Sequence, residues 1–311
     1  WRISMNSWTC LLVEDADSDQ LVHIWTWIHI AGLMAAFFAP LAGLLIAAID
    51  LVPAVRILYL FAFIMMTVKA WILYRYSTET KQGYIRMEET QDKPLLSLLG
   101  GLKEVLVQIL KTPRTLVVLG IMVVMGVVMM INNTFWSILA TEKLGILAEH
   151  LAIFPFAKSG LMLILYFLLV PRLNVRRFRN PMILGFAGFL TANLILVTMP
   201  SGNYFLLLIS VLIEAASLAM FGPLLDALTI ISIDNAERAR INSILFAVVI
   251  LLTSPFGWIA GQLSEINRVL PFVLNICLFI IGSGLVWLAW RWRDRGATTA
   301  NLEIVSASVS E

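Results

Sequence analysis

The chain has 311 residues, of which 60% are hydrophobic and only 14% are charged, and its formal net charge is +2. Soluble domains are about half apolar and a quarter charged, and here the apolar excess lies in long blocks. Since about 20 apolar residues cross the roughly 30 Å hydrocarbon layer of a bilayer, this composition predicts an all-α, polytopic helical membrane protein and argues against a secreted or cytosolic one. The two cysteines, Cys10 and Cys277, are far apart and indicate neither a disulfide framework nor a metal site.

Eight apolar blocks predict about eight transmembrane helices. They cover residues 24–47, 54–76, 115–139, 148–171, 181–199, 204–231, 241–262 and 270–292. The stretch RISMNSWTCLLV before them is typical of the tail of an earlier helix and is too short to span. We expect residues 296–311 to be a disordered tail.

Residues 77–112 form the one long connection between predicted spans. They begin with the polar stretch STETKQGYIRMEETQDKP and continue as a more apolar one. In that second part Leu102, Leu106 and Ile109 fall on one helical face. The pattern fits an interfacial amphipathic helix, or a solvated linker with some helical turns.

Basic residues are concentrated in alternate loops. One set of loops holds Lys81, Arg86, Lys93, Arg172, Arg176, Arg177, Arg179, Arg238, Arg240, Arg291, Arg293 and Arg295. The opposite set holds only Arg56, Lys143 and Arg268. Because cytoplasmic loops carry the excess of Lys and Arg, we expect a multi-pass plasma-membrane protein with a cytoplasmic C-terminus.

Two predicted hairpins, residues 24–76 and 241–292, resemble each other. Aligned pairs are Asp19 with Glu237, Gly43 with Gly261, Pro53 with Pro271 and Arg75 with Arg293. The first helix of each hairpin has proline and glycine near its outer half, namely Pro40 and Gly43, and Pro255 and Gly261. Both copies start on the same side, so the predicted repeat is parallel.

This arrangement resembles the major facilitator superfamily (MFS), whose transporters have two parallel six-helix halves. The resemblance implies that the eight spans are helices five to twelve of a twelve-helix fold that lacks its first four helices here. Residues 1–76 would then hold the last hairpin of the N-terminal bundle. Residues 77–112 would be the cytoplasmic linker, and residues 113–295 the six-helix C-terminal bundle.

Two motifs carry this resemblance. VPRLNVRRFRNP is similar to the basic cytoplasmic turn between helices eight and nine, although the family's Gly and Asp are absent. GLMAAFFAPLAG is similar to the Gly-Pro antiporter signature of helix five, although Ala39 replaces a glycine. The resemblance implies gating or structural roles for the matching residues, which are Arg172, Arg176, Arg177, Arg179, Pro40 and Gly43.

Two opposite charges lie inside predicted spans. Lys158 and Glu214 are each about ten residues from the same side, or roughly 15 Å deep, close to the bilayer midplane. A lone charge there costs at least ~2.5–3.5 kcal/mol, so we expect the two to pair. The pair is either a purely stabilising contact or a substrate or proton site.

Four other polar side chains are candidates with a plainer alternative. Asn132 and Asn133 could line a substrate path, or could simply bond across helices. His29 could relay protons, but a helix–helix hydrogen bond is the favoured interpretation. Asp226 follows Gly222 and Pro223 near the cytoplasmic end of its span, where we favour a headgroup-level position near Arg172 or Arg176 over a gate.

The densest carboxylate cluster lies in the turn at 14–19 and consists of Glu14, Asp15, Asp17 and Asp19. It fails as a calcium loop, because Gln20 and Thr26 stand where glycine and glutamate are needed. As a magnesium–diphosphate site it would need a second acidic cluster, and SIDNAE supplies only Asp234 and Glu237. A solvated turn that caps the first helix is favoured.

We therefore expect a secondary active transporter that moves a small molecule by alternating access. The expected coupling ion is a proton, and drug or metabolite efflux is a candidate activity. We expect a monomer in the lipid bilayer that is not an enzyme, with no metal, no cofactor and no nucleic-acid partner. Two alternatives remain: a membrane-embedded prenyl- or phosphotransferase that uses the turn 14–19, and a truncated, non-transporting MFS relative.

Overall fold

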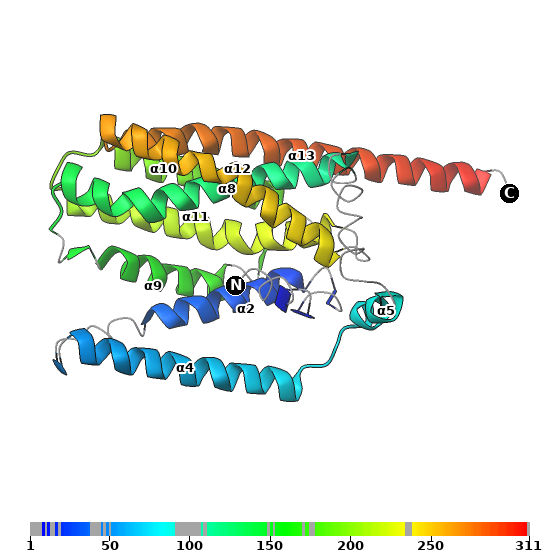
Figure 1. Cartoon of the computed structure of the whole chain (residues 1–311). Helices are drawn as coiled ribbons and strands as arrows, with labels where there is room; N and C mark the ends of the chain where they lie inside the picture. Colours follow the sequence, from blue (N-terminus) through cyan, green and yellow to red (C-terminus); the bar gives the residue numbers. More distant parts are fainter. Residues whose placement is uncertain are drawn as a thin grey trace.

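The computed structural model describes most of the chain and shows only helices and turns there. The described residues are 8–9, 11–12, 16–17, 20–37, 45, 48–49, 51–90, 107, 111–147, 150–151, 153–169, 172–173, 178–233 and 238–309. Within them there is no strand, so the all-α prediction is confirmed for this part of the chain. The helices run back and forth along one common direction (Figure 1).

A helix overlaps each predicted span. Their bounds are α2 Leu21–Phe37, α4 Leu51–Tyr76, α8 Pro113–Ile138, α9 Ile153–Leu168, α10 Arg179–Thr198, α11 Tyr204–Ile231, α12 Arg238–Ile266 and α13 Leu270–Val309. Six are long and apolar enough to cross a membrane, namely α4, α8, α10, α11, α12 and α13. The chain is thus a multi-pass membrane protein, while α2 and α9 are apolar but shorter in the described residues.

The third predicted span continues further than its apolar block. After α8 the chain makes a π-helical turn, η1, at Leu139–Lys143. Gly145 then adopts a positive φ of 67°, which L side chains rarely adopt, and the helix ends. This end delays the start of α9 to Ile153, so α9 has only 16 residues where we predicted a span over 148–171.

The centre of the bundle is formed by α8, α10, α11 and α13, with α9 packed on α11 and α12 packed on α8. Aromatic side chains fill the contact between α10, α11 and α13. The ring centroids of Phe186 and Phe221 lie 4.6 Å apart, and the rings of Phe189 and Phe279 stack at 5.3 Å. These four side chains are all fully buried, so they set the distance between the three helices.

The contact between α10 and α13 favours a glycine at position 282. A Cβ atom on Gly282 would lie 2.5 Å from Cζ of Phe186, whose ring is fully buried. We predict that Gly282→Ala lowers the free energy of unfolding by about 1–3 kcal/mol, as overpacked core substitutions do. Thermal unfolding in detergent measures this effect.

The matched control is Gly284→Ala in the same helix, because nothing lies within 4 Å of a Cβ at that position. It should leave stability unchanged or slightly higher, since alanine favours a helix more than glycine does. Equal melting temperatures for the two variants would show that α10 and α13 do not pack as closely as described.

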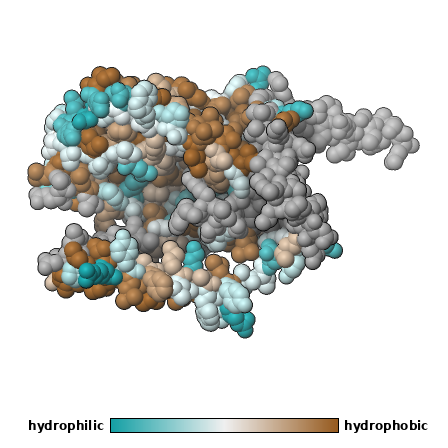
Figure 2. Space-filling view, in the orientation of Figure 1, coloured by the Kyte–Doolittle hydropathy of each residue, from teal (hydrophilic) through white to brown (hydrophobic). Residues whose placement is uncertain are grey.

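The helices α2 and α4 lie on one side of this bundle (Figure 1). α2 packs against α9 and α11, whereas nearly all described side chains of α4 are exposed. Hydrophobic residues cover much of the described surface (Figure 2), and on α4 they include Tyr59, Leu60, Phe63 and Trp71. Such a surface suits contact with lipid chains. Lys69, also in α4, is exposed among these residues, as a snorkelling lysine would be.

Three predictions concern the remaining segments. Within the predicted linker, α5 forms at Lys81–Thr90, in the polar part rather than in the apolar part, and Leu102, Leu106 and Ile109 lie outside the described residues. α13 continues as a helix to Val309, so the expected disordered tail at 296–311 is wrong for its described residues. No proline interrupts the sequence there to end the helix. α2 and α12 run in the same direction and α4 and α13 run back (Figure 1), so helix directions agree with the repeat, which stays a prediction.

Candidate functional site

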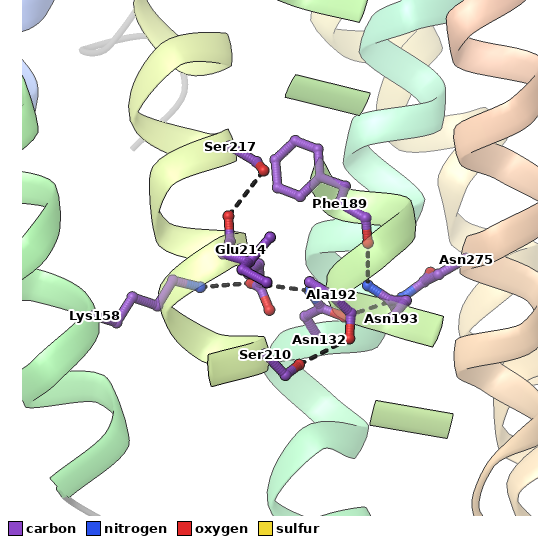
Figure 3. Close-up of polar contacts among 10 residues, drawn as sticks. Asn132, Lys158, Phe189, Ala192, Asn193, Ser210, Glu214, Ser217 and Asn275 are labelled. Carbon is purple, nitrogen blue, oxygen red and sulfur yellow. Dashed lines mark hydrogen bonds and ion pairs between the residues drawn. The ribbon is translucent and has the colours of Figure 1, made fainter. Parts of the chain in front are cut away.

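The two charges inside the predicted spans meet. Nζ of Lys158 in α9 donates to Oε1 of Glu214 in α11 at 2.6 Å (Figure 3). The side chain of Glu214 is 9% exposed and that of Lys158 is 28% exposed. The predicted pairing is therefore present, with the carboxylate buried inside the bundle and the ammonium reaching it from α9.

Two asparagines extend this pair across the bundle. Nδ2 of Asn132 in α8 donates to the same Oε1 of Glu214 at 3.2 Å. Nδ2 of Asn275 in α13 donates in turn to Oδ1 of Asn132 at 3.0 Å. The polar chain thus runs from α9 through α11 and α8 to α13 (Figure 3). A single salt bridge becomes a network that joins four helices.

Small residues on α11 allow the helices to approach at this level. Ala215 and Ser217 follow Glu214 and are buried, and the hydroxyl of Ser217 bonds back to the carbonyl of Ile213 at 2.8 Å. Ser210 crosses to α10, where its hydroxyl donates to the carbonyl of Ala192 at 2.8 Å. Small and hydroxyl side chains permit such close packing in membranes, where every buried polar group needs a partner.

A second polar contact lies closer to the C-terminal end of α11. Nε2 of His29 in α2 lies 2.9 Å from Oδ2 of Asp226, and the imidazole ring stacks on Tyr166 of α9 with centroids 5.7 Å apart. Gly222, one turn before Asp226, leaves room for the ring. The helix–helix hydrogen bond favoured for His29 is present. The expectation that Asp226 lies near Arg172 or Arg176 stays a prediction, since Arg176 lies outside the described residues and the described partner of Asp226 is His29.

This contact should stabilise the attachment of α2. Both side chains are about one-third exposed, so we predict that His29→Gln lowers the free energy of unfolding by only about 0.5–1 kcal/mol. Backbone amides of α2 should exchange with deuterium faster in this variant, as measured by mass spectrometry. His23→Gln is the control, because His23 is exposed on the same helix. Equal exchange in both variants would contradict a fastening role for His29.

The other predicted site residues are dispersed. Asn133 is exposed on α8, and Arg172 is exposed after α9. Pro255 and Gly261 lie within the continuous helix α12. Arg176, Arg177, Pro40 and Gly43 lie outside the described residues, as do Glu14, Asp15, Asp19, Asp234 and Glu237. In the described part of the chain no three His, Cys, Asp or Glu residues are grouped as a metal site would require.

One residue of the network, Asn275, was not among the predicted site residues. It is an uncharged amide within the apolar stretch of α13, and its side chain is fully buried. A polar residue at such a position needs a hydrogen-bond partner, and that requirement is the signal that could have found it. The sequence offered no way to tell which helix supplies the partner.

Comparison with known proteins identifies no relative. No protein-family model, no curated protein and no solved structure matches the chain. The polar network and the helical membrane architecture are therefore the observations on which a function can be proposed.

Proposed function

We propose that the protein is a secondary active transporter of the major facilitator type, which moves a small molecule across the plasma membrane by alternating access with proton coupling. The observation that carries the proposal is the ion pair between Lys158 and Glu214, whose carboxylate is buried among the helices of a membrane protein. Ionisable groups at such depth are costly, and in membrane proteins they mark substrate and ion pathways.

The pair has the properties of a switch. A proton on Glu214, or a charged group on the solute, would weaken its bond to Lys158 and so favour a different packing of α9 against α11. A ligand shifts such an equilibrium only by its difference in affinity for the two states. Since the carboxylate is the shared acceptor for Lys158 and Asn132, a change in its charge alters contacts to two helices at once.

The alternating movement would occur between two groups of helices. Under this proposal α2 and α4 belong to one half and α8 to α13 form the other. The contact between His29 and Asp226 joins α2 to α11 and would have to open and close in each cycle. Inter-repeat contacts of this kind fit rigid-body rocking of one bundle against another.

The proposal includes an orientation. Arg179 stacks over Trp290 at 4.1 Å where α10 begins and α13 leaves the apolar region, and we place this end in the cytoplasm because the arginine excess lies there. Cysteines introduced at Asn180 and Ser201, exposed at opposite ends of α10, should react with an impermeant maleimide from opposite membrane faces. Cys10 and Cys277 must first be replaced by serine. Labelling of both sites from one face would reject the orientation and the span.

The function itself is tested in proteoliposomes. Uptake of a panel of radiolabelled amines, carboxylates and neutral drugs is measured with an inward or outward pH gradient. The proposal predicts gradient-driven movement of at least one class, lost in Lys158→Gln/Glu214→Gln. A more exposed pair, Glu142 in η1 and Arg268 in the turn between α12 and α13 at 2.7 Å, gives the control variant Glu142→Gln/Arg268→Gln. Movement that is the same in liposomes without protein would reject transport for the solutes in the panel.

A further inference from the structure

Two amide oxygens deep in the bundle have no hydrogen-bond partner among the described residues. They are Oδ1 of Asn193 in α10 and Oδ1 of Asn275 in α13. The two residues are 2% and 0% exposed. Buried polar atoms are satisfied by protein or bound molecules in the great majority of cases, so each of these oxygens requires an explanation.

The two asparagines come from α10 and α13, which pack against each other. The helices are antiparallel (Figure 1), and their contact includes Gly282 against Phe186 and the stacked rings of Phe189 and Phe279. One turn further along the same seam, α10 presents Asn193 and α13 presents Asn275. Side chains about one turn apart lie on the same helix face, so the two amides stand at one level. Figure 3 labels both residues.

The orientation of each amide is fixed by a neighbouring acceptor. Nδ2 of Asn193 donates to the carbonyl of Phe189 at 3.1 Å, so a flip would place oxygen against oxygen. Asn275 donates to Asn132, and Asn132 donates to the carboxylate of Glu214. Flipping either amide of that chain would again oppose two acceptors. Both free atoms are therefore oxygens rather than misassigned nitrogens.

From this geometry we propose a binding site for a hydrogen-bond donor group between Asn193 and Asn275. The site presents two neutral acceptors, and a third unpaired buried atom, Nε1 of Trp25, belongs to α2 and is not part of it. A single group with two N–H or O–H bonds can satisfy both oxygens. Its source is either a water molecule or a hydroxyl or ammonium group of a solute, and a buried water normally has two to four polar partners.

A donor bound by both amides makes them energetically dependent on each other. The test is a double-mutant cycle of Asn193→Leu, Asn275→Leu and the combined variant, measured as melting temperatures of the whole protein in detergent. Either single substitution already releases the donor. The melting temperature of the combined variant should therefore be close to that of the less stable single variant. The matched control combines Ser210→Ala with Asn275→Leu, which should be additive, since Ser210 bonds to Ala192 instead.

Two salts distinguish the sources. Methylammonium carries N–H donors and tetramethylammonium carries none. If the two substitutions are non-additive in plain buffer, and to the same extent in both salts, the bound donor is water. If the two substitutions are non-additive only in methylammonium, the bound donor is a solute group.

Additive effects in plain buffer and in both salts, with Asn193→Leu neutral or stabilising, would overturn the site. That result would mean that the oxygens are unpaired, because replacing an unpaired buried acceptor removes a penalty. Transport is not measured at any step. The outcome therefore does not depend on the proposed transport function, and a failure of one leaves the other untouched.

Discussion

Lys158→Met should be among the most damaging single substitutions in this protein, lowering the free energy of unfolding by about 3–5 kcal/mol. It leaves the carboxylate of Glu214 buried with only the amide of Asn132 as a described partner. Removing one partner of a buried pair costs more than the pair contributes, because the remaining charge is uncompensated. The double variant Lys158→Met/Glu214→Gln should recover most of that loss. Thermal unfolding in detergent and yield of folded protein provide the measurement.

Transport measurements on the same variants distinguish a functional switch from a purely structural contact. If the pair is a switch, the double variant folds but loses proton-coupled uptake in proteoliposomes. The exchanged pair Lys158→Glu/Glu214→Lys should also fold better than either single change. Lys143→Met is the control, because Lys143 is exposed in η1. A double variant with normal coupled transport would restrict the pair to a structural role, and normal transport in both single variants would remove any role.

Asn132→Leu should have the second-largest effect, about 1–3 kcal/mol of lost stability, because it breaks two hydrogen bonds of the buried network. Among the described residues Glu214 would keep only Lys158, and Nδ2 of Asn275 would lose its acceptor in a fully buried position. Leucine has nearly the shape of asparagine, so the loss would reflect polar contacts rather than a cavity. The midpoint of denaturation in detergent provides the measurement.

The adjacent Asn133→Leu is the control for this substitution. Asn133 has the same side chain one residue further along α8, but it is exposed and outside the network. Its replacement should change stability by less than about 0.5 kcal/mol, as is usual for surface positions. If both asparagine variants lose the same stability, the effect belongs to helix α8 in general and not to the contact with Glu214.

The helices were predictable because their apolar blocks are long. The bounds 204–231 for α11 agree with Tyr204–Ile231, and the turn PSGN gives a clear stop and start there. The end of α8 was harder to place. Its π-helical turn continues into the polar residues Thr141 to Lys143, and hydropathy gives no sign of such a turn.

Within the site, depth along a helix was predictable and rotation around it was not. Equal depth correctly paired Lys158 with Glu214, because only one acid stood at the level of the lysine. Asn132 and Asn133 are equally deep, and only packing shows that the first joins the network and the second does not. The contact between His29 and Asp226 was not predicted, because the position of His29 against Tyr166 and Asp226 depends on how α2 packs.

The short length of α9 has a consequence for the lipid around the protein. Its 16 residues extend about 24 Å, several ångströms less than the roughly 30 Å hydrocarbon layer of an average bilayer. Ile153 at one end and Phe167 at the other are exposed, so this hydrophobic mismatch would be met by local thinning of the bilayer. Thinning brings headgroups and water closer to Lys158. Acyl-chain length would thereby tune the cost of opening its bond to Glu214, and bilayers of different thickness would act as environments of different polarity for the same pair.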